Sequence, residues 1–300
     1  MLNNQVIVSM MKDKSGRLWI GTYGGGLTIY DPATRAVETI STRSSKQKLG
    51  NDHVYSIVQD KNREMWVGTL GGGVTRLPVE GHEEIHRHKP LDVASLSNDY
   101  VSTIVVDSTN SIWVGTFGGG VSRYNAQAGE FELYNQETKS LSNNLVSTML
   151  VDQNNRLWVG TMGGGLNLYD RSSGRFVLLD EKEGLLNNFV HGLQEDNHGN
   201  LWISSNLGIT KYIPSSGKFI NFEGIGGSEF RRGASFKASD GKIYFGGING
   251  FNVFVPDSVK ANPYVPPVVL TDLKVFNKSV TPGADGSPLK ESLQTTKTVT

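Results

Sequence analysis

The sequence contains no cysteine, which excludes disulfide bridges, thiolate metal sites and cysteine nucleophiles and leaves the redox compartment open. It has no excess charge either, because 29 basic and 29 acidic residues cancel. Since no basic stripe is present, we expect no nucleic-acid partner. Long apolar runs are also missing, and we expect no membrane span within the chain. The segment MLNNQVIVSMMKDKSG at its start does not have the composition of a signal peptide.

Glycine, by contrast, is abundant, with 36 of 300 residues and no collagen period, which indicates repeated tight turns. Three consecutive glycines recur within RLWIGTYGGGLTIYD (17–31), EMWVGTLGGGVTRLP (64–78), SIWVGTFGGGVSRYN (111–125) and RLWVGTMGGGLNLYD (156–170), and NLWISSNLGITKYIP (200–214) is a looser copy. The units carry an aromatic residue every 42 to 47 residues, at Trp19, Trp66, Trp113, Trp158, Trp202 and Tyr244. A period in the forties without a helical pattern is typical of β-propeller blades.

Each unit divides into four short segments of strand-forming residues. In residues 98–135 these are YVSTIVVD, SIWVGT, GVSRYN and EFELYN, separated by turn formers. The second segment is apolar on both faces, which suits a sheet packed between two others, so we expect its tryptophan to pack between blades. The sequence therefore predicts an all-β fold, a β-propeller of four-stranded antiparallel blades with six repeat units. The expected blades span about 4–47, 48–94, 95–139, 140–183, 184–225 and 226–257.

The glycine triplets lie in the predicted hairpin between the second and third strands, where positive φ or close backbone approach requires glycine. A phosphate-binding loop would need a helix after the glycines, whereas a strand follows each triplet. In an antiparallel blade this hairpin and the link to the next blade emerge on one face, which we call the mouth. The links are KLGNDHV, SLSNDYV, SLSNNLV and GLLNNFV. A propeller ligand usually binds at such a mouth.

Candidate ligand-binding residues are the positions on the mouth where the units differ. Aromatic rings can stack there on the apolar face of a sugar, while Asn, Asp and Arg bind hydroxyl or acidic groups. The alternative is that these side chains only cap the channel or face water. The candidates are Tyr23, His53, Asp99, Tyr100, Phe117, Asn144, Asn188, His191, Glu229, Arg231 and Arg232. The paired arginines in SEFRRGAS depart most from the repeat and suit an acidic sugar.

Other motifs point to structure rather than chemistry. HEEIH, with His82, Glu83 and His86, matches the zinc-protease pattern, but that chemistry needs a helix, and we place the motif in an enlarged hairpin between third and fourth strands. Asp152 and Asp196 follow first strands and predict Asx turns rather than calcium loops. No G-x-S-x-G elbow precedes a helix. We therefore expect no catalytic residue, no metal and no cofactor.

The spacing of Asn, Asp, Trp and Gly in the pattern LxNNxVxxxxxDxxGxLWIGTxGGGLxxYD resembles the two-component regulator propeller repeat. That repeat occurs in periplasmic sensor regions of hybrid two-component systems from gut Bacteroidetes, and the resemblance covers residues 1–257. NPYVPPVVLTDLKVFNKSV (262–280) resembles the entry into that family's three-tyrosine (Y_Y_Y) β-sandwich. Residues 258–300 are therefore expected to be a linker and the first strand of a truncated sandwich, loosely ordered from Pro282 onward.

The resemblance implies a periplasmic sensor that is part of an inner-membrane receptor. Its propeller would bind an oligosaccharide breakdown product and relay the signal to a histidine kinase absent from this chain, and homodimerisation would use the missing sandwich. The family's propellers typically have seven blades, so we expect a fragment whose six units either close or leave the ring open. Two alternatives remain: a propeller lyase or glycan hydrolase that uses His191 and Glu229, and a structural scaffold for dimerisation.

Overall fold

The computed structural model describes residues 3–223, 229–259, 272–284 and 287–289. The chain divides into two compact units, Met1–Val259 and Lys260–Thr300. Apart from one short 3₁₀ segment, η1 (Pro256–Ser258), every regular element in the described residues is a β-strand. The predicted all-β class is therefore confirmed.

The strands of the first unit form six separate antiparallel sheets in chain order, which we call blades 1 to 6. Blade 1 holds β1 (Ile7–Lys12), β2 (Leu18–Thr22), β3 (Leu27–Tyr30) and β4 (Val37–Ile40); blade 2 holds β5 (Val54–Gln59), β6 (Met65–Thr69), β7 (Gly73–Leu77) and β8 (Glu84–His86). Blade 3 holds β9 (Val101–Val106), β10 (Ile112–Thr116), β11 (Gly120–Asn125) and β12 (Glu130–Tyr134); blade 4 holds β13 (Val146–Val151), β14 (Leu157–Thr161), β15 (Leu166–Asp170) and β16 (Arg175–Leu179). Blade 5 holds β17 (Val190–Glu195), β18 (Leu201–Ser205), β19 (Gly208–Ile213) and β20 (Lys218–Glu223); blade 6 holds β21 (Phe230–Lys237), β22 (Ile243–Gly247) and β23 (Gly250–Phe254).

The prediction of four strands per blade is confirmed for blades 1 to 5, and among the described residues the sheet of blade 6 holds three strands, β21 to β23. The chain leaves β23 at Phe254, and Pro256 begins η1 two residues later. β23 is thus followed directly by η1, and residues 260–271 lie outside the described part of the chain.

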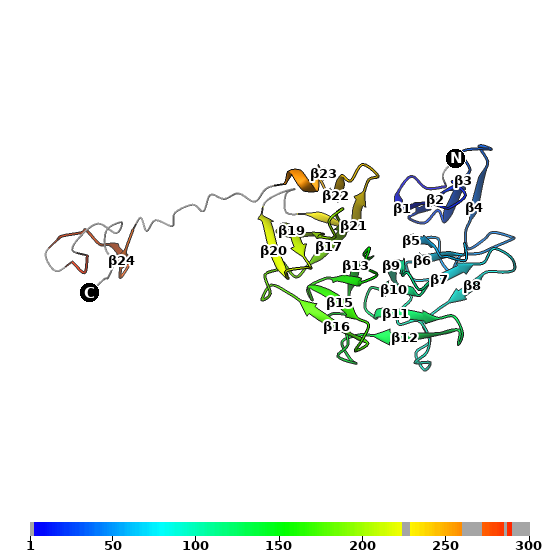
Figure 1. The fold of residues 1–300 in the computed structure, drawn as a ribbon, viewed down its shortest axis with the longest axis horizontal. Coiled ribbons are helices and arrows are strands. Elements are labelled where there is room, and N and C mark those ends of the chain that lie inside the picture. Colours follow the sequence, from blue (N-terminus) through cyan, green and yellow to red (C-terminus); the bar gives the residue numbers. More distant parts are fainter. Residues whose placement is uncertain (1–2, 224–228, 260–271, 285–286, 290–300) are drawn as a thin grey trace. The chain divides into compact units, whose positions relative to one another are not determined.

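The first strand of each blade packs against the first strand of the next, from β1 against β5 through to β17 against β21. Figure 1 shows the six blades side by side in an arc, with these first strands on the inner side and blades 1 and 6 at the two ends. This order is that of a propeller, in which each sheet is covered by its neighbours. The predicted propeller architecture is therefore confirmed.

The blades at the two ends of the arc expose apolar side chains. Met10 of blade 1 is 68% exposed, and Phe236 and Phe251 of blade 6 are 63% and 68% exposed. Tyr244, which occupies the tryptophan position of the sixth repeat, is half-buried between these two rings. The other five tryptophan positions have a following blade to pack against, and all five are buried.

Each tryptophan packs between its own blade and the next one. Trp66 of blade 2 packs with Val101, Ile104 and Tyr124 of blade 3, and the same pattern repeats along the arc. Trp113 and Trp158 are completely buried. A cationic side chain lies over each indole, at 5.2 to 5.7 Å from the ring centroid, which adds to the burial. The interblade spaces are thus the hydrophobic core of this unit.

In blades 1 to 5, an aspartate directly after the first strand anchors the tryptophan. The indole Nε1–H of Trp19, Trp66, Trp113, Trp158 and Trp202 donates to Asp13, Asp60, Asp107, Asp152 and Asp196 respectively, at 2.8 to 3.3 Å. The other carboxylate oxygen accepts backbone N–H groups of the following turn; Asn154 and Arg156, for example, donate to Asp152. The Asx turns predicted at these positions are therefore confirmed.

The glycine triplets are hairpin turns, and their three positions have different roles. In blade 3, Gly118 and Gly120 have φ values of 107° and 78°, a region that favours glycine. A Cβ atom on Gly119 would lie 2.7 Å from the carbonyl carbon and oxygen of Ser97 in the loop before the blade. The outer glycines therefore form the turn, and the middle one allows a loop to pack on it.

Replacing Gly119 by alanine should lower the free energy of unfolding by about 1–3 kcal/mol, because the new methyl group overlaps the Ser97 backbone and the loop must move. Urea denaturation followed by tryptophan fluorescence measures this change. An unchanged midpoint would show that the loop moves away at no cost, contrary to the packing described here.

The described part of the second unit contains a short hairpin of two-residue strands, in which β24 (Lys274–Val275) pairs with β25 (Lys278–Ser279). Phe276 and Asn277 form its turn, with φ values of 50° and 62°. Residues 260–271, 285–286 and 290–300 of the predicted linker and sandwich segment lie outside the described residues. The expected three-tyrosine sandwich stays a prediction.

Candidate functional site

The mouth is built by hydrogen bonds between each glycine hairpin and the loop that follows its blade. In blades 1 to 4, the first and third glycine N–H groups donate to one carbonyl oxygen of that loop at 2.9 to 3.1 Å; the acceptors are Asp52, Asp99, Asn144 and Asn188. The two kinds of loop therefore emerge on the same face, as predicted. These backbone bonds make the mouth a fixed surface.

Exposed rings gather on this surface in matching positions. An isolated β-bridge joins the residue before each triplet to the residue before the next first strand: Tyr23 to His53, Leu70 to Tyr100, Phe117 to Leu145 and Met162 to Phe189. Tyr23, Tyr100 and Phe189 are 46%, 53% and 41% exposed. The Tyr23 and His53 rings meet edge to face with centroids 4.3 Å apart. The mouth thus presents solvent-exposed aromatic faces.

Blade 6 adds two arginines to the mouth through a bulge in its first strand. Between Phe230 and Ser235 that strand advances five residues while its partner advances two, from Gly247 to Phe245. In blade 5 the corresponding first strand advances only three residues, from Val190 to Leu193. The extra residues place Arg231 and Arg232 in the bulge, and both are exposed. Bulges of this kind redirect side chains and are enriched beside functional sites.

Arg232 extends from blade 6 to side chains of blades 3 and 4. Its guanidinium carbon lies 4.6 Å from the centroid of the Phe117 ring, and Nη1 lies 3.5 Å from Sδ of Met162. Only one face of the guanidinium is covered by Phe117, so its remaining N–H groups can donate to a ligand oxygen. The structure thus brings Arg232 and Phe117, both predicted site residues, into contact.

Three other predicted residues are engaged within their own loops. Oδ1 of Asp99 accepts the backbone N–H of His88, and the side chains of Asn144 and Asn188 do the same for Gln136 and Glu181, at 2.7 to 3.1 Å. Each bond joins the loop at the end of one blade to the entry into the next. These side chains shape the mouth, and fewer of their polar atoms remain for a ligand.

His191 and Glu229 lie in contrasting environments. His191 is 6% exposed, its Nε2 lies 2.6 Å from Oδ1 of Asn206, and its Nδ1 is buried without a partner among the described residues. Glu229 is exposed, and its carbonyl oxygen accepts the N–H of Ile248. A catalytic pair would need His191 to reach a ligand at the mouth, and its burial opposes that use.

The HEEIH motif does not form the predicted enlarged hairpin as a whole. Its second half, Glu84–His86, is strand β8, and the His86 ring stacks on Trp66 at 6.0 Å and meets Phe131 edge to face at 5.5 Å. Burial lowers the pKa of His86. The alternation of Glu, Ile and His is a strand pattern that sequence reasoning missed, and His86 serves as an aromatic core residue.

Sequence reasoning also missed Leu145, which is 42% exposed at the mouth. It occupies the same repeat position as His53, Tyr100 and Phe189, so the register of the repeat was a sufficient signal. In the part of the chain that the structure describes, no three His, Asp or Glu side chains meet in an arrangement suited to a metal ion. No helix among the described residues has the length and apolar character to cross a bilayer.

Comparison with known proteins agrees with this architecture. Five segments, 1–24, 48–71, 95–118, 140–163 and 184–207, match the sequence profile of the family described as two component regulator propeller. Among curated proteins, Histidine kinase P4 of Formosa agariphila is 34% identical over 122 residues, which are 40% of this chain and 9% of that protein. The chain therefore spans less than a tenth of this curated relative.

Solved structures with the same arrangement include the extracellular domain of the hybrid two component system BT3049 from B. thetaiotaomicron, with a TM-score of 0.75 and 28% identity over 94% of this chain and 39% of that one. Virginiamycin B lyase from Staphylococcus aureus has a TM-score of 0.61 and 16% identity over 87% of this chain and 88% of its own; that identity shows a shared fold alone. The matched segments and the blade geometry agree: each of blades 1 to 5 contains a segment that matches the two component regulator propeller repeat.

Proposed function

We propose that this propeller is the ligand-sensing part of a hybrid two-component system and that it recognises an oligosaccharide at the mouth. Proteins similar to this chain include a histidine kinase and the extracellular domain of a hybrid two component system. On this proposal the unit lies outside the cytoplasm, as expected for a periplasmic sensor. The histidine kinase that receives the signal lies in another part of the receptor, and the intact receptor is a homodimer joined through its sandwich domain.

The observation that carries the proposal is the group of exposed rings beside a charged bulge. Tyr23, Tyr100 and Phe189 present aromatic faces, and such faces stack on the apolar side of a sugar ring. Arg231 and Arg232 supply fork-shaped donors that suit a carboxylate. Because Arg232 already rests on Phe117, less conformational entropy is lost when a ligand binds. An acidic oligosaccharide fits these features best.

Replacing Arg232 by alanine should weaken binding of an acidic oligosaccharide by roughly 10-fold, since a charge-assisted hydrogen bond is lost. Isothermal titration calorimetry with a panel of neutral and acidic oligosaccharides measures the dissociation constants. Arg175→Ala, at an exposed arginine in strand β16 of blade 4, is the matched control and should leave them unchanged. Equal affinity in the wild-type protein and in Arg232→Ala would contradict the assignment of this site.

A further inference from the structure

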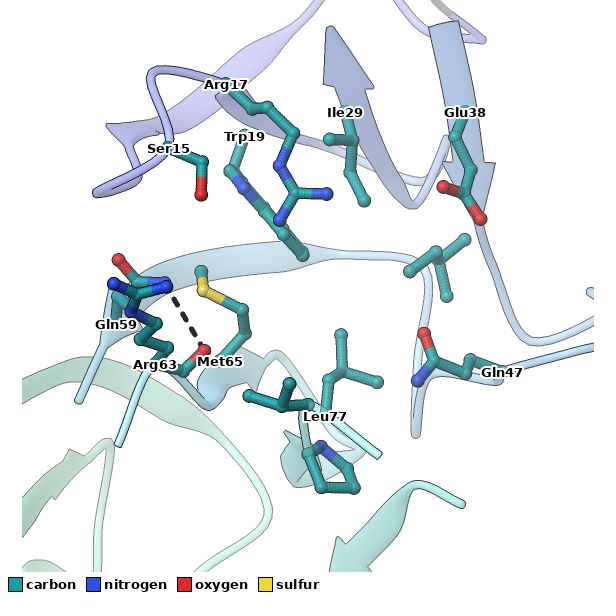
Figure 2. Close-up of a pocket in the computed structure, with 13 residues that line it drawn as sticks. Ser15, Arg17, Trp19, Ile29, Glu38, Gln47, Gln59, Arg63, Met65 and Leu77 are labelled. Atoms are coloured by element: carbon teal, nitrogen blue, oxygen red, sulfur yellow. Dashed lines mark hydrogen bonds between the residues drawn. The ribbon is translucent and has the colours of Figure 1, made fainter. Parts of the chain in front are cut away.

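A cavity of about 300 Å³ lies between blades 1 and 2, separate from the mouth residues described above. Figure 2 shows Trp19 and Ile29 of blade 1 facing Met65 and Leu77 of blade 2 across it. These four side chains are buried, so the inner wall is apolar. The volume is at the lower end of the range for small-molecule sites.

The cavity exists because blade 2 lacks an aromatic ring that the following blades have. In each of the next four interblade spaces the tryptophan packs on a ring from the third strand of the next blade. The centroid distances are 5.0 Å for Trp66–Tyr124, 4.8 Å for Trp113–Tyr169, 5.7 Å for Trp158–Tyr212 and 4.7 Å for Trp202–Phe254. At this position blade 2 has Leu77, which pairs with Met65 as Tyr124 pairs with Ile112. Trp19 therefore has no ring partner from blade 2.

A second ring is missing from the same place. In blades 3, 4 and 5 the tyrosine pairs across to a phenylalanine of the fourth strand; these phenylalanines are Phe131, Phe176 and Phe219. In blade 2 the chain turns away after Leu77 at Pro78, and β8 pairs only with residues 74–76 of β7. The space that two rings fill elsewhere is left partly open beside Trp19.

One end of the cavity has an arginine at a position where other blades have a turn residue. Arg63 has a φ of 68°, and the residues at the same turn position, Gly16, Asn110, Asn155 and Gly199, also have positive φ. Glycine and asparagine tolerate this conformation better than arginine does. Among the described residues the Arg63 guanidinium makes no hydrogen bond or ion pair, although it lines the cavity. Arg63 thus adopts an unfavourable backbone conformation, and its guanidinium lies at the opening of the cavity without a partner among the described residues.

Arg17 adds a second guanidinium to the lining. Its Nε donates to Asp13 at 2.8 Å, which leaves the Nη groups available, and Figure 2 shows the guanidinium turned toward the cavity. Gln59 lies beside Arg63 at one end of the cavity, whereas Glu38 and Gln47 lie at the other end. The charge of the lining therefore orients a bound anion toward Arg63 and away from Glu38.

We propose that this cavity is a binding site for a small aromatic carboxylate. The ring of the ligand takes the position beside Trp19 that a tyrosine or phenylalanine side chain occupies in the other interblade spaces. Its carboxylate accepts hydrogen bonds from Arg63 and Arg17 at the open end. The site is independent of the oligosaccharide site at the mouth, and it makes the blade 1–blade 2 contact responsive to a second ligand.

Phenylacetate is a suitable probe, and saturation-transfer NMR with a concentration series gives its dissociation constant. The wild-type chain should bind one equivalent saturably. Leu77→Tyr should weaken this binding at least roughly 10-fold, because it restores the ring present at Tyr124, Tyr169 and Tyr212 and fills the space. The same variant should raise the thermal midpoint, which shows that it is folded and that the cavity has been filled.

Arg63→Asn provides a second test at an exposed position whose new residue is the one found in blades 3 and 4. It should weaken phenylacetate binding by roughly 10-fold and leave binding of neutral benzyl alcohol unchanged, since the ring site is intact. Arg232→Ala should alter neither ligand, which separates this site from the mouth. No saturable phenylacetate binding to the wild-type chain, or equal binding to wild type and Leu77→Tyr, would overturn the proposal.

Discussion

Replacing Trp113 by alanine should lower the free energy of unfolding by about 3–5 kcal/mol, the range found when large buried aromatic side chains are truncated. Trp113 is completely buried. Its indole contacts the rings of Tyr134 and Tyr169 at centroid distances of 5.8 and 4.8 Å and donates to Asp107 at 3.1 Å. The truncation therefore opens a cavity between blades 3 and 4 and leaves the carboxylate of Asp107 without one of its donors.

Trp19→Ala is the matched comparison within the same chain. Trp19 has the same anchor, a bond of 2.8 Å to Asp13, but it has no ring partner from blade 2 and borders an existing cavity. Truncation there removes fewer packing contacts, so the loss should be smaller than at Trp113. Urea denaturation monitored by circular dichroism compares the two variants with wild type. A loss at Trp19 equal to that at Trp113 would show that the ring partners contribute little.

The repeat itself was sufficient to predict the propeller, because each blade must bury the same positions. The 42- to 47-residue spacing of Trp and Tyr, the apolar second strand and the glycine hairpin are all consequences of packing a sheet between two sheets. The shared face of hairpins and interblade loops followed from antiparallel connectivity alone. These predictions used only local patterns and their period, which is why they are confirmed by the structure.

Departures from the repeat were harder to interpret. The 3₁₀ segment that begins at Pro256, soon after the third strand of blade 6, has no counterpart in the other blades. In blade 2, the aromatic role of His86 depends on contacts with Trp66 and with Phe131 of the next blade. The role of His86 is a tertiary effect, and the resemblance of HEEIH to a zinc-protease motif obscured its strand pattern. The missing ring at Leu77 was visible in the sequence but meaningful only once its position beside Trp19 was known.

For the candidate mouth residues, too, the sequence predicted some properties and not others. Their location could be predicted from the repeat, since all lie near hairpins or interblade loops. The sequence could not predict which of their polar atoms stay free for a ligand. The side chains of Asp99 and Asn144, for example, accept hydrogen bonds from backbone N–H groups a few residues away in the chain. The contact between Arg232 and Phe117 joins blades 6 and 3 and depends on the bulge in β21. Such long-range contacts have no signal in a single repeat unit.

Replacing Asp107 by alanine should cost about 3–5 kcal/mol, because a buried charge with several partners is removed and the partners stay behind. Its Oδ1 accepts from the backbone N–H groups of Thr109 and Ser111 at 2.9 Å. Its Oδ2 accepts from Trp113 at 3.1 Å and from Arg171 of blade 4 at 3.0 Å. The substitution thus disrupts the turn, the tryptophan anchor and a link between two blades at once.

The carboxylate of Asp107 also makes the free energy of unfolding depend on pH. Burial by itself would raise the pKa of Asp107, but hydrogen bonds from Thr109, Trp113, Ser111 and Arg171 lower it from 3.8 to about 2. A pKa that is lower in the folded state gives stability that is fully present above the unfolded value and is lost as pH falls through the folded value. The free energy of unfolding should therefore decline between about pH 4 and pH 2.

Asp107→Asn separates the charge from the shape of the side chain. The amide keeps an oxygen that can accept from the turn but has no charge to titrate, so this variant should be less stable than wild type at neutral pH. Its stability should also fall less steeply than that of the wild-type protein between about pH 4 and pH 2, although Asp13 and Asp196, whose pKa values are also lowered, keep part of the slope. Urea denaturation at a series of pH values measures both slopes. Parallel slopes for wild type and Asp107→Asn would mean that Asp107 does not contribute to acid sensitivity and that its hydrogen bonds stabilise the neutral form as well as the charged one.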